Sequence, residues 1–205
     1  MENEIKIGVG IPTYKNPNGL MRCLCSVEHA PIANFYIIDN SIKNLGVAAS
    51  WNRMILEAIS DKIDWLFLLN DDVEVREGCL TKTIKILSHM TQRPPIVSGY
   101  TGRYIGHNDG LILNEIYDFC AFALSPLSIK NTIGLFDEQF FPAYFEDCDF
   151  AHRAKIANVD IGVLPCFQVN HHNCGTRDCV THESFNRNKE LYIEKWGGAP
   201  SEEKK

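Results

Sequence analysis

The sequence predicts an α/β protein with a doubly wound, mostly parallel central sheet and helices on both faces. Short apolar segments alternate along the chain with longer segments whose apolar residues recur at helical spacing. Several short segments, such as WLFLL at 65–69, are apolar throughout, as expected of strands covered on both faces. No repeat or low-complexity linker interrupts this alternation, so we expect a single domain over residues 1–198. The polar end of the chain, residues 199–205, is expected to be disordered.

In the first half of the chain, predicted strands and helices alternate regularly. Apolar, β-branched segments predict buried strands over 6–12, 35–40, 65–72 and 95–100. Apolar residues at helical spacing predict helices over 16–30, 47–59 and 80–90. Each helix lies between two strands, which is the order required for parallel strands joined by crossover helices.

The second half is less regular. Residues 111–125 predict one long strand or a pair of strands, followed by a short helix that ends at Gly134. An aromatic-rich loop over 134–145 precedes a predicted helix over 146–160, which begins with acidic residues, as a helix N-terminus favours. A short strand over 161–165 and a helix over 184–198 complete the domain; the last helix ends in glycines at the expected C-cap position.

The composition is that of an ordinary globular protein and restricts its partners. The 205 residues carry a net charge of −6, and Lys and Arg are dispersed, so we expect no nucleic-acid polymer as a partner. No apolar run approaches the ~20 residues that span a bilayer. The N-terminus has neither a basic region nor an apolar leader. We therefore expect a soluble cytoplasmic protein whose 8 cysteines are reduced.

Three predicted strands end in polar residues that could form one crevice. Ligands of open parallel sheets bind at the carboxyl ends of the strands. The third strand, LFLLNDD, is so apolar that Asp71 and Asp72 follow it at a partly desolvated rim, where an unpaired charge is costly. A divalent cation would offset this cost. The alternative is a solvated turn in which one Asp caps the next segment. These strand ends are Pro12-Thr13-Tyr14, Asp39-Asn40-Ser41 and Asn70-Asp71-Asp72.

A second acidic cluster follows the aromatic loop. Glu146, Asp147 and Asp149 stand at the start of the predicted helix, where N-capping and the helix dipole explain one or two of the three. The aromatic residues over 140–145 suit a wall against a sugar or a nucleobase, and core packing explains them equally well. Neither the glycine fingerprint of dinucleotide-binding folds nor a P-loop is present.

The ordered set of motifs resembles the inverting glycosyltransferases of family 2, which have the GT-A fold. The motifs are GIPTYKNP, YIIDNS, NLGVAASWNRMI, LLNDDVEV, FFPAYFEDCDFAHRA and YIEKWGG, and they extend nearly from one end of the chain to the other. NLGVAASWN followed by LLNDDVEV is most similar to the rhamnosyltransferase-like branch. The resemblance implies a GT-A domain over 1–198 that takes a nucleotide-sugar donor.

The resemblance also implies which residues contact the donor. Those matching the nucleobase positions are Pro12, Thr13, Tyr14 and Asp39. Those matching positions near the ribose and diphosphate are Asn44, Gly46, Asn52 and Arg53.

The two acidic clusters match the metal and catalytic motifs of that family. NDD occupies the place of the D-x-D motif with Asn70 in the first position, which implies Asp72 as metal ligand and Asp71 as a contact to the ribose or sugar. Glu146 and Asp147 match the E-D pair, with Asp147 as catalytic base and Glu146 orienting the acceptor. Mn²⁺ or Mg²⁺ would neutralise the departing diphosphate. The implied reaction is metal-dependent, inverting transfer from a UDP- or dTDP-linked sugar to an acceptor hydroxyl.

The segment HHNCGTRDCVTH over 171–182 admits two interpretations. By spacing alone it fits a tetrahedral zinc site. The zinc ligands would be Cys174, Cys179, His182 and either His171 or His172. The family resemblance instead implies that His171 or His172 completes the metal site of Asp72, with Arg177 near the phosphates.

Two other classes of function remain compatible with the same residues. A nucleotidyltransferase acting on sugar phosphates would share the acidic pair and the cation, although it would normally have a basic glycine-rich phosphate loop, which is absent. A non-catalytic module that binds a sugar or nucleotide would not require both acidic clusters. Neither the transferred sugar nor the acceptor follows from the sequence.

Overall fold

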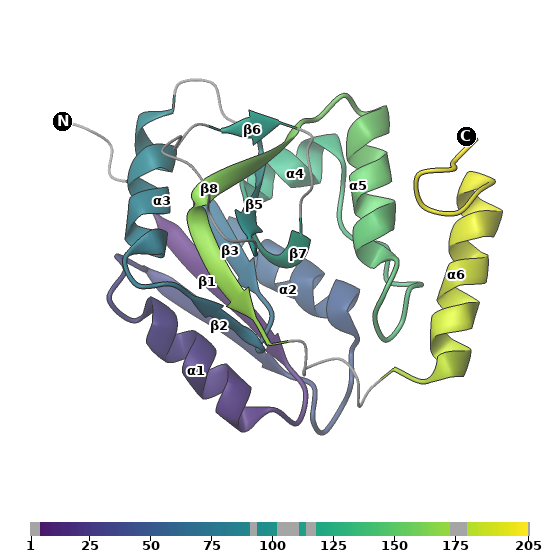
Figure 1. Ribbon diagram of the computed structural model, residues 1–205, viewed down its shortest axis with the longest axis horizontal. Helices are drawn as coiled ribbons and strands as arrows, with labels where there is room; N and C mark the ends of the chain where they lie inside the picture. The colour runs from purple at the N-terminus through teal and green to yellow at the C-terminus, as the bar shows by residue number, and fades with distance from the viewer. Residues whose placement is uncertain (1–4, 91–93, 102–110, 114–117, 173–179, 205) are drawn as a thin grey trace.

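The computed structural model describes residues 5–90, 94–101, 111–113, 118–172 and 180–204, whose strands form one central sheet (Figure 1). The strand order is β2-β1-β3-β7-β5-β8-β4, and β6 also pairs with β8. The strands are β1 (Ile7–Thr13), β2 (Asn34–Asp39), β3 (Trp65–Leu69), β4 (Val73–Val75), β5 (Ile96–Tyr100), β6 (Ile112–Leu113), β7 (Asp118–Leu124) and β8 (Ile161–His171). The helices are α1 (Pro17–Val27), α2 (Val47–Ser60), α3 (Cys79–His89), α4 (Pro126–Thr132), α5 (Glu146–Ile156) and α6 (His182–Trp196).

The sheet is mixed, with most strands in one direction. β1 is parallel to β2 and to β3, and β5 is parallel to β8. β7 lies between β3 and β5 and is antiparallel to both, so β5 and β8 run in the same direction as β1. β4 and β6 are antiparallel to β8. The predicted α/β fold with a mostly parallel sheet is therefore confirmed.

Two hydrophobic cores lie on opposite faces of the sheet. Apolar residues of α1 and α3 pack against one face, and those of α2, α4 and α5 pack against the other. Figure 1 shows this arrangement, with α6 outside α5 and away from the sheet. The continuous apolar runs of β3 and β7 follow from this architecture, because both of their faces are covered.

Strand β2 differs from the prediction of a buried strand. It lies at the edge of the sheet and pairs with β1 alone among the described strands. Phe35 and Ile37 are each 45% exposed. The prediction was wrong because an apolar, β-branched run does not reveal whether a strand is central or at the edge.

The predicted strands over 65–72 and 161–165 also have different bounds. β3 ends at Leu69, a turn occupies 70–72, and β4 then pairs with the far end of β8. β8 extends beyond 165 to His171, in an antiparallel pair that sets His171 opposite Val73. The longer β8 therefore carries its terminal histidine to the turn after β3.

The chain end lies against α6. Residues 199–204, which we expect to be disordered from their composition, turn back so that the Lys204 amide donates to the Trp196 carbonyl. The Tyr192 hydroxyl donates a hydrogen bond to Glu203. Among the described residues, no helix combines the length and the apolar character needed to cross a membrane.

Candidate functional site

Three adjoining cavities lie near the carboxyl ends of the parallel strands. The smallest has a volume of about 50 Å³, and shares Val47, Asn70 and Asp72 with a second cavity of about 290 Å³. The second shares Asp118 and Asp147 with a third cavity of about 620 Å³.

The small cavity is lined by Pro12, Thr13, Tyr14, Asn40, Asn44, Gly46 and Asp71, among others. The second cavity holds a concentration of acidic groups, and its lining includes Asp72, Asp118, Glu146, Asp147 and His171. We call this second cavity the acidic cavity.

Hydrogen bonds to the Asp71 carboxylate connect the end of β1 to the turn after β3. The Thr13 hydroxyl donates to Asp71 Oδ2 at 2.6 Å and the Tyr14 amide at 3.3 Å, while Asn16 Nδ2 donates to Oδ1 at 3.2 Å. Burial raises the pKa of Asp71, and the Thr13 and Asn16 hydrogen bonds oppose that rise. Asp71 borders the small cavity, and both of its carboxylate oxygens accept hydrogen bonds from the segment after β1. Its contact to a donor stays a prediction.

The loop between β2 and α2 is organised by two asparagines. Asn40 Oδ1 accepts the Leu45 amide at 2.9 Å, and its Nδ2 donates to the Ser50 hydroxyl at 3.0 Å. Asn44 Oδ1 accepts the Gly46 amide at 2.9 Å. The Leu45 and Gly46 amides, which belong to neither a strand nor a helix, therefore find their acceptors on asparagine side chains.

Gly46 joins this loop to the aromatic loop before α5. Its φ of +84° lies in the left-handed region, and an added Cβ would lie 2.9 Å from Phe141 Cδ2. The next residue, Val47, donates its amide to the Pro142 carbonyl at 2.8 Å. A glycine is therefore required here by both backbone conformation and close packing.

Asp39 and Arg53, two predicted donor contacts, line none of the three cavities. Asp39 is exposed and accepts the Ser41 amide at 2.8 Å, and hydrogen bonds with Ser41 lower its pKa. The Arg53 side chain is 63% exposed and pairs with Glu57 at 3.0 Å. The ends of β1 and β3 therefore line these cavities, whereas the side chains of Asp39 and Arg53 do not.

Asn52 also lies away from the cavities, because its amide is bonded to the aromatic loop. Its Nδ2 donates to the Phe136 carbonyl at 2.9 Å and to Glu138 at 2.8 Å, and its Oδ1 accepts the Phe136 amide at 2.8 Å. This buried side chain holds the loop to α2. The structure therefore gives Asn52 a role in holding the aromatic loop, and its predicted donor contact stays a prediction.

Asp72 and His171 meet in the acidic cavity. Asp72 is 3% exposed. Its Oδ1 lies 3.3 Å from His171 Nε2, and this interaction raises the pKa of the imidazole. The pairing follows from β4, which sets His171 beside the turn that carries Asp72.

The two other histidines of the 171–182 segment, His172 and His182, contact groups outside the acidic cavity. His172, the residue after β8, has its Nε2 3.3 Å from Glu74 Oε2. His182 begins α6, and its Nδ1 accepts a hydrogen bond from Asn186 Nδ2 at 3.0 Å. Cys174, Arg177 and Cys179 lie outside the described residues. Of the two candidate histidines, the structure brings His171 to Asp72.

Glu146 and Asp147 open α5 and face the acidic cavity. Glu146 is 5% exposed, and its Oε2 has no hydrogen-bond partner among the described residues. Burial, followed by the charge of Asp147, raises the pKa of Glu146 well above its ordinary value. Burial also raises the pKa of Asp147, whose Oδ1 accepts the Cys148 amide at 2.8 Å. Trp51 Nε1, a second buried polar atom without a partner in the described part of the chain, belongs to the same lining. Two such atoms at one cavity indicate a place for a polar ligand.

The loop that presents these acids is strained and is held by α6. Tyr144 and Phe145 have φ values of +73° and +75°, which bulky residues rarely adopt. Asn188 of α6 is fully buried and donates its amide to the Ala143 carbonyl at 3.0 Å and the Tyr144 carbonyl at 3.3 Å. Strain of this kind persists where surrounding contacts determine the backbone, and it is frequent at functional sites.

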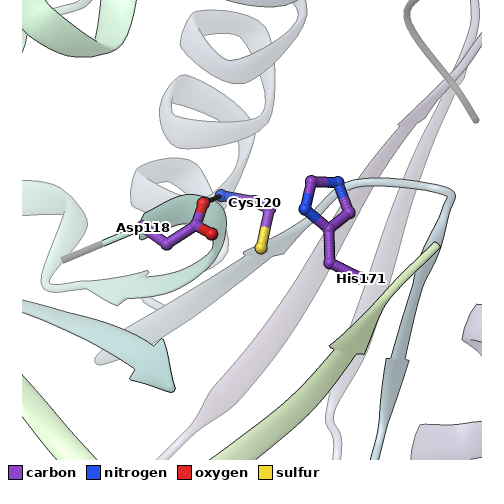
Figure 2. A group of neighbouring side chains, drawn as sticks. All are labelled: Asp118, Cys120 and His171. Carbon is purple, nitrogen blue, oxygen red and sulfur yellow. Dashed lines mark hydrogen bonds between the residues drawn. The ribbon is translucent and has the colours of Figure 1, made fainter. Parts of the chain in front are cut away.

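Sequence reasoning missed two residues of the acidic cavity, Asp118 and Cys120. Both lie on β7, in a stretch that matches none of the motifs, although their i, i+2 spacing in a strand places them on one face. Asp118, Cys120 and His171 each offer a ligand atom, and these atoms lie within 4.8 Å of one another (Figure 2). Only the sheet order reveals this group, since β7 and β8 are far apart in sequence.

Comparison with known proteins identifies the fold. No protein-family model and no curated protein matches the sequence. Among solved structures, GalNAc-T7 with UDP, GalNAc and Mn²⁺ matches 96% of this chain and 49% of its own, with a TM-score of 0.67 and 14% identity. S. aureus TarS 1–349 in complex with UDP-GlcNAc matches 95% of this chain and 67% of its own, with a TM-score of 0.62 and 13% identity. The chain thus spans about half the length of the GalNAc-T7 structure. These likenesses, with the sheet order above, show that the chain has the GT-A fold of glycosyltransferases.

Proposed function

We propose that this protein is a metal-dependent, inverting glycosyltransferase that moves a sugar from a UDP- or dTDP-linked donor to an acceptor hydroxyl. One observation carries the proposal: Asp147, a half-buried carboxylate, lines both the acidic cavity and the 620 Å³ cavity beyond it. A base that takes a proton from an acceptor must lie between donor and acceptor. The structural neighbours GalNAc-T7 and TarS were solved with UDP and UDP-GlcNAc, respectively, which supports a UDP-linked donor.

The small cavity is the proposed site of the nucleoside. Tyr14 offers an aromatic ring, and the loop carrying Asn44 and Gly46 brings backbone groups close to the same space. Asp71 and Thr13 form the wall between this cavity and the sheet. The donor diphosphate would then extend past Asn70 and Asp72, which line both this cavity and the acidic one.

The donor set at the junction fits a divalent cation. Asp72 and His171 place a carboxylate oxygen and an imidazole nitrogen 3.3 Å apart, a separation that suits two ligands of one ion. The buried, unpartnered oxygen of Glu146 borders the same space. Mn²⁺ accepts imidazole more readily than Mg²⁺ does, so this pair favours Mn²⁺. When bound, such an ion supplies positive charge that stabilises the departing nucleoside diphosphate.

The two adjacent carboxyl groups, Glu146 and Asp147, have different roles in the proposed proton transfer. Burial raises the pKa of Asp147 toward the range in which a carboxylate is an effective general base. Burial, followed by the charge of Asp147, raises the pKa of Glu146 well above its ordinary value, which favours Glu146 as the group that keeps its proton and Asp147 as the base. Asp147 then accepts the proton of the acceptor hydroxyl as its oxygen attacks the anomeric carbon, and Glu146 orients that hydroxyl. A single displacement of this kind inverts the configuration.

Binding and release measurements test the proposal. Titration calorimetry with UDP, UDP-hexoses and a dTDP-linked deoxyhexose, each with and without Mn²⁺, should show metal-dependent binding. The dTDP-linked donor is included because the motifs resemble the rhamnosyltransferase-like branch. Incubation with the bound donor should release the nucleoside diphosphate. The absence of binding under all conditions would exclude a glycosyltransferase. Release of pyrophosphate from a nucleoside triphosphate and a sugar 1-phosphate would instead indicate a nucleotidyltransferase.

The Asp147→Asn variant tests the assignment of the base. It should bind the donor with unchanged affinity, because Asp147 is not placed against the nucleotide or the proposed cation. Transfer should fall at least 100-fold, the usual scale of general-base catalysis. A transfer rate near that of the wild type would contradict this role.

A further inference from the structure

β7 brings a thiol and a carboxylate to the rim of the acidic cavity. Asp118 and Cys120 occupy alternate positions of the strand, and the Cys120 amide donates to Asp118 Oδ1 at 2.8 Å. The Asn70 amide donates to the Cys120 carbonyl at 2.8 Å, which sets Cys120 beside the end of β3. Both side chains belong to the lining of the acidic cavity.

His171 reaches the same place from β8. Its ligand nitrogen lies within 4.8 Å of the Asp118 carboxylate and of the Cys120 thiol. In Figure 2 the imidazole ring of His171 faces Cys120, and Asp118 lies on the other side of Cys120. One carboxylate, one thiol and one imidazole, from two strands that do not pair with each other, therefore converge at the cavity.

The two nitrogens of His171 face different groups. Nε2 lies 3.3 Å from Asp72 Oδ1, and the ring edge that carries Nδ1 is turned toward Cys120 and Asp118 (Figure 2). Histidines that bind a metal through one nitrogen usually have the other bonded to a carboxylate, which fixes the orientation of the ring. Asp72 is placed to orient His171 in this manner.

We propose that Asp118, Cys120 and His171 form a binding site for a thiophilic divalent cation, of which Zn²⁺ is the natural example, with Asp72 orienting the histidine. Thiolate and imidazole ligands favour Zn²⁺ and Co²⁺ over Mg²⁺. Zinc bonds of about 2.0–2.3 Å place tetrahedral ligands about 3.5 Å apart, so binding draws these side chains inward by about 1 Å. The ion replaces the thiol proton, which passes to solvent. This site uses neither Cys174 nor Cys179.

This inference rests on the proposed function in one respect, because both cation sites use His171. Asp72 orients His171 through Nε2 when the donor and its cation are absent, and the donor's cation would replace that contact, so the two ions would use His171 alternately. The thiophilic site can therefore be tested without a sugar nucleotide. The full-length protein is titrated with Co²⁺ alone and followed by absorption spectroscopy. A Co²⁺–thiolate bond produces a charge-transfer band in the near ultraviolet. We expect one band that saturates at one equivalent of Co²⁺, and displacement of Co²⁺ by Zn²⁺.

Variants assign the ligands. Cys120→Ser should abolish the charge-transfer band, whereas Cys25→Ser, which changes an exposed cysteine of α1, should leave it intact. Asp118→Asn, at a partly exposed position, should weaken Co²⁺ binding at least tenfold and retain the band. Asp72→Asn should weaken binding about 10–100-fold, as expected for the partner of a metal-binding histidine.

Two outcomes would overturn the proposal. One is the absence of any thiolate band in the wild-type protein. The other is a band that persists in Cys120→Ser and disappears in Cys174→Ser or Cys179→Ser, which would place the metal in the 171–182 segment. If Cys120→Ser does not fold, unchanged Co²⁺ affinity in Asp118→Asn would be sufficient to reject the site. UDP binding is measured separately, so a failure here is distinguishable from a failure of the proposed function.

Discussion

Removal of the Asp149 carboxylate should destabilise the protein by disconnecting α6 from α5. Asp149 is fully buried; its Oδ2 accepts Arg153 Nε at 2.8 Å, and its Oδ1 lies 2.9 Å from Trp196 Nε1 and 2.6 Å from Lys195 Nζ. In Asp149→Ala the Trp196 N–H loses this acceptor, and Arg153 retains the Ile133 carbonyl as a partner. The variant therefore isolates the contribution of one buried carboxylate.

The magnitude follows from the burial of the partners. Breaking a buried ion pair by removing one member costs about 3–5 kcal/mol. The Arg153 and Lys195 side chains are 18% and 33% exposed, and Lys195 retains its ion pair with Asp137 at 2.7 Å. The loss of stability in Asp149→Ala should therefore lie at the low end of this range, about 3 kcal/mol. For a domain of this size, about 3 kcal/mol lowers Tm by about 6–12 °C.

Thermal and urea unfolding, followed by circular dichroism, measure this effect. Glu57→Ala provides the matched control, because Arg53 and Glu57 form an exposed i,i+4 pair on α2. Its loss should change the stability by at most about 0.5 kcal/mol. If the two variants lose the same stability, burial of the Asp149 network is not the source of its strength, and the reasoning is refuted.

Two further predictions concern the residues around the cavities. Gly46→Ala should lower the stability by about 1–3 kcal/mol and weaken UDP binding, because the added methyl group meets Phe141 at a left-handed backbone position; an unchanged urea midpoint would contradict this. Burial raises the pKa of Glu146 above 4.5, so the folded state binds this proton more tightly than the unfolded state. The wild type should therefore lose stability as pH rises through the raised pKa, whereas Glu146→Gln should not; parallel stability–pH curves would show that the carboxyl is not responsible.

The order of the strands and helices could be predicted because each one has a pattern of apolar residues that is visible in its own segment of the sequence. The apolar runs of β1 and β3 and the helical spacing of α2 and α3 depend only on neighbouring residues. The same holds for the strand ends, since Thr13, Asp71 and Asp72 follow apolar segments and the carboxyl ends of parallel strands share an edge. The convergence of these residues was therefore predictable without coordinates.

The role of Asn52 could not be predicted in this way. A polar residue on a helix that begins at a site can face the ligand or a neighbouring loop, and the spacing is the same in both cases. Its buried amide is bonded to Phe136 and Glu138, which are more than 80 residues away in sequence. Similarly, only the tertiary pairing of β4 with β8 selects His171 over His172 as the neighbour of Asp72.

By itself, the sequence determined the α/β fold class, the alternation of strands and helices, and the two acidic clusters at the ends of strand and loop. The tertiary structure alone decided that β2 is an edge strand, that α6 holds the strained loop before Glu146, and that Asp118 and Cys120 face His171. The physical reason is the range of the interactions. Hydrophobic periodicity and turn chemistry act between neighbours in the chain, whereas exposure, strain and ligand geometry depend on which distant segments the sheet order brings into contact.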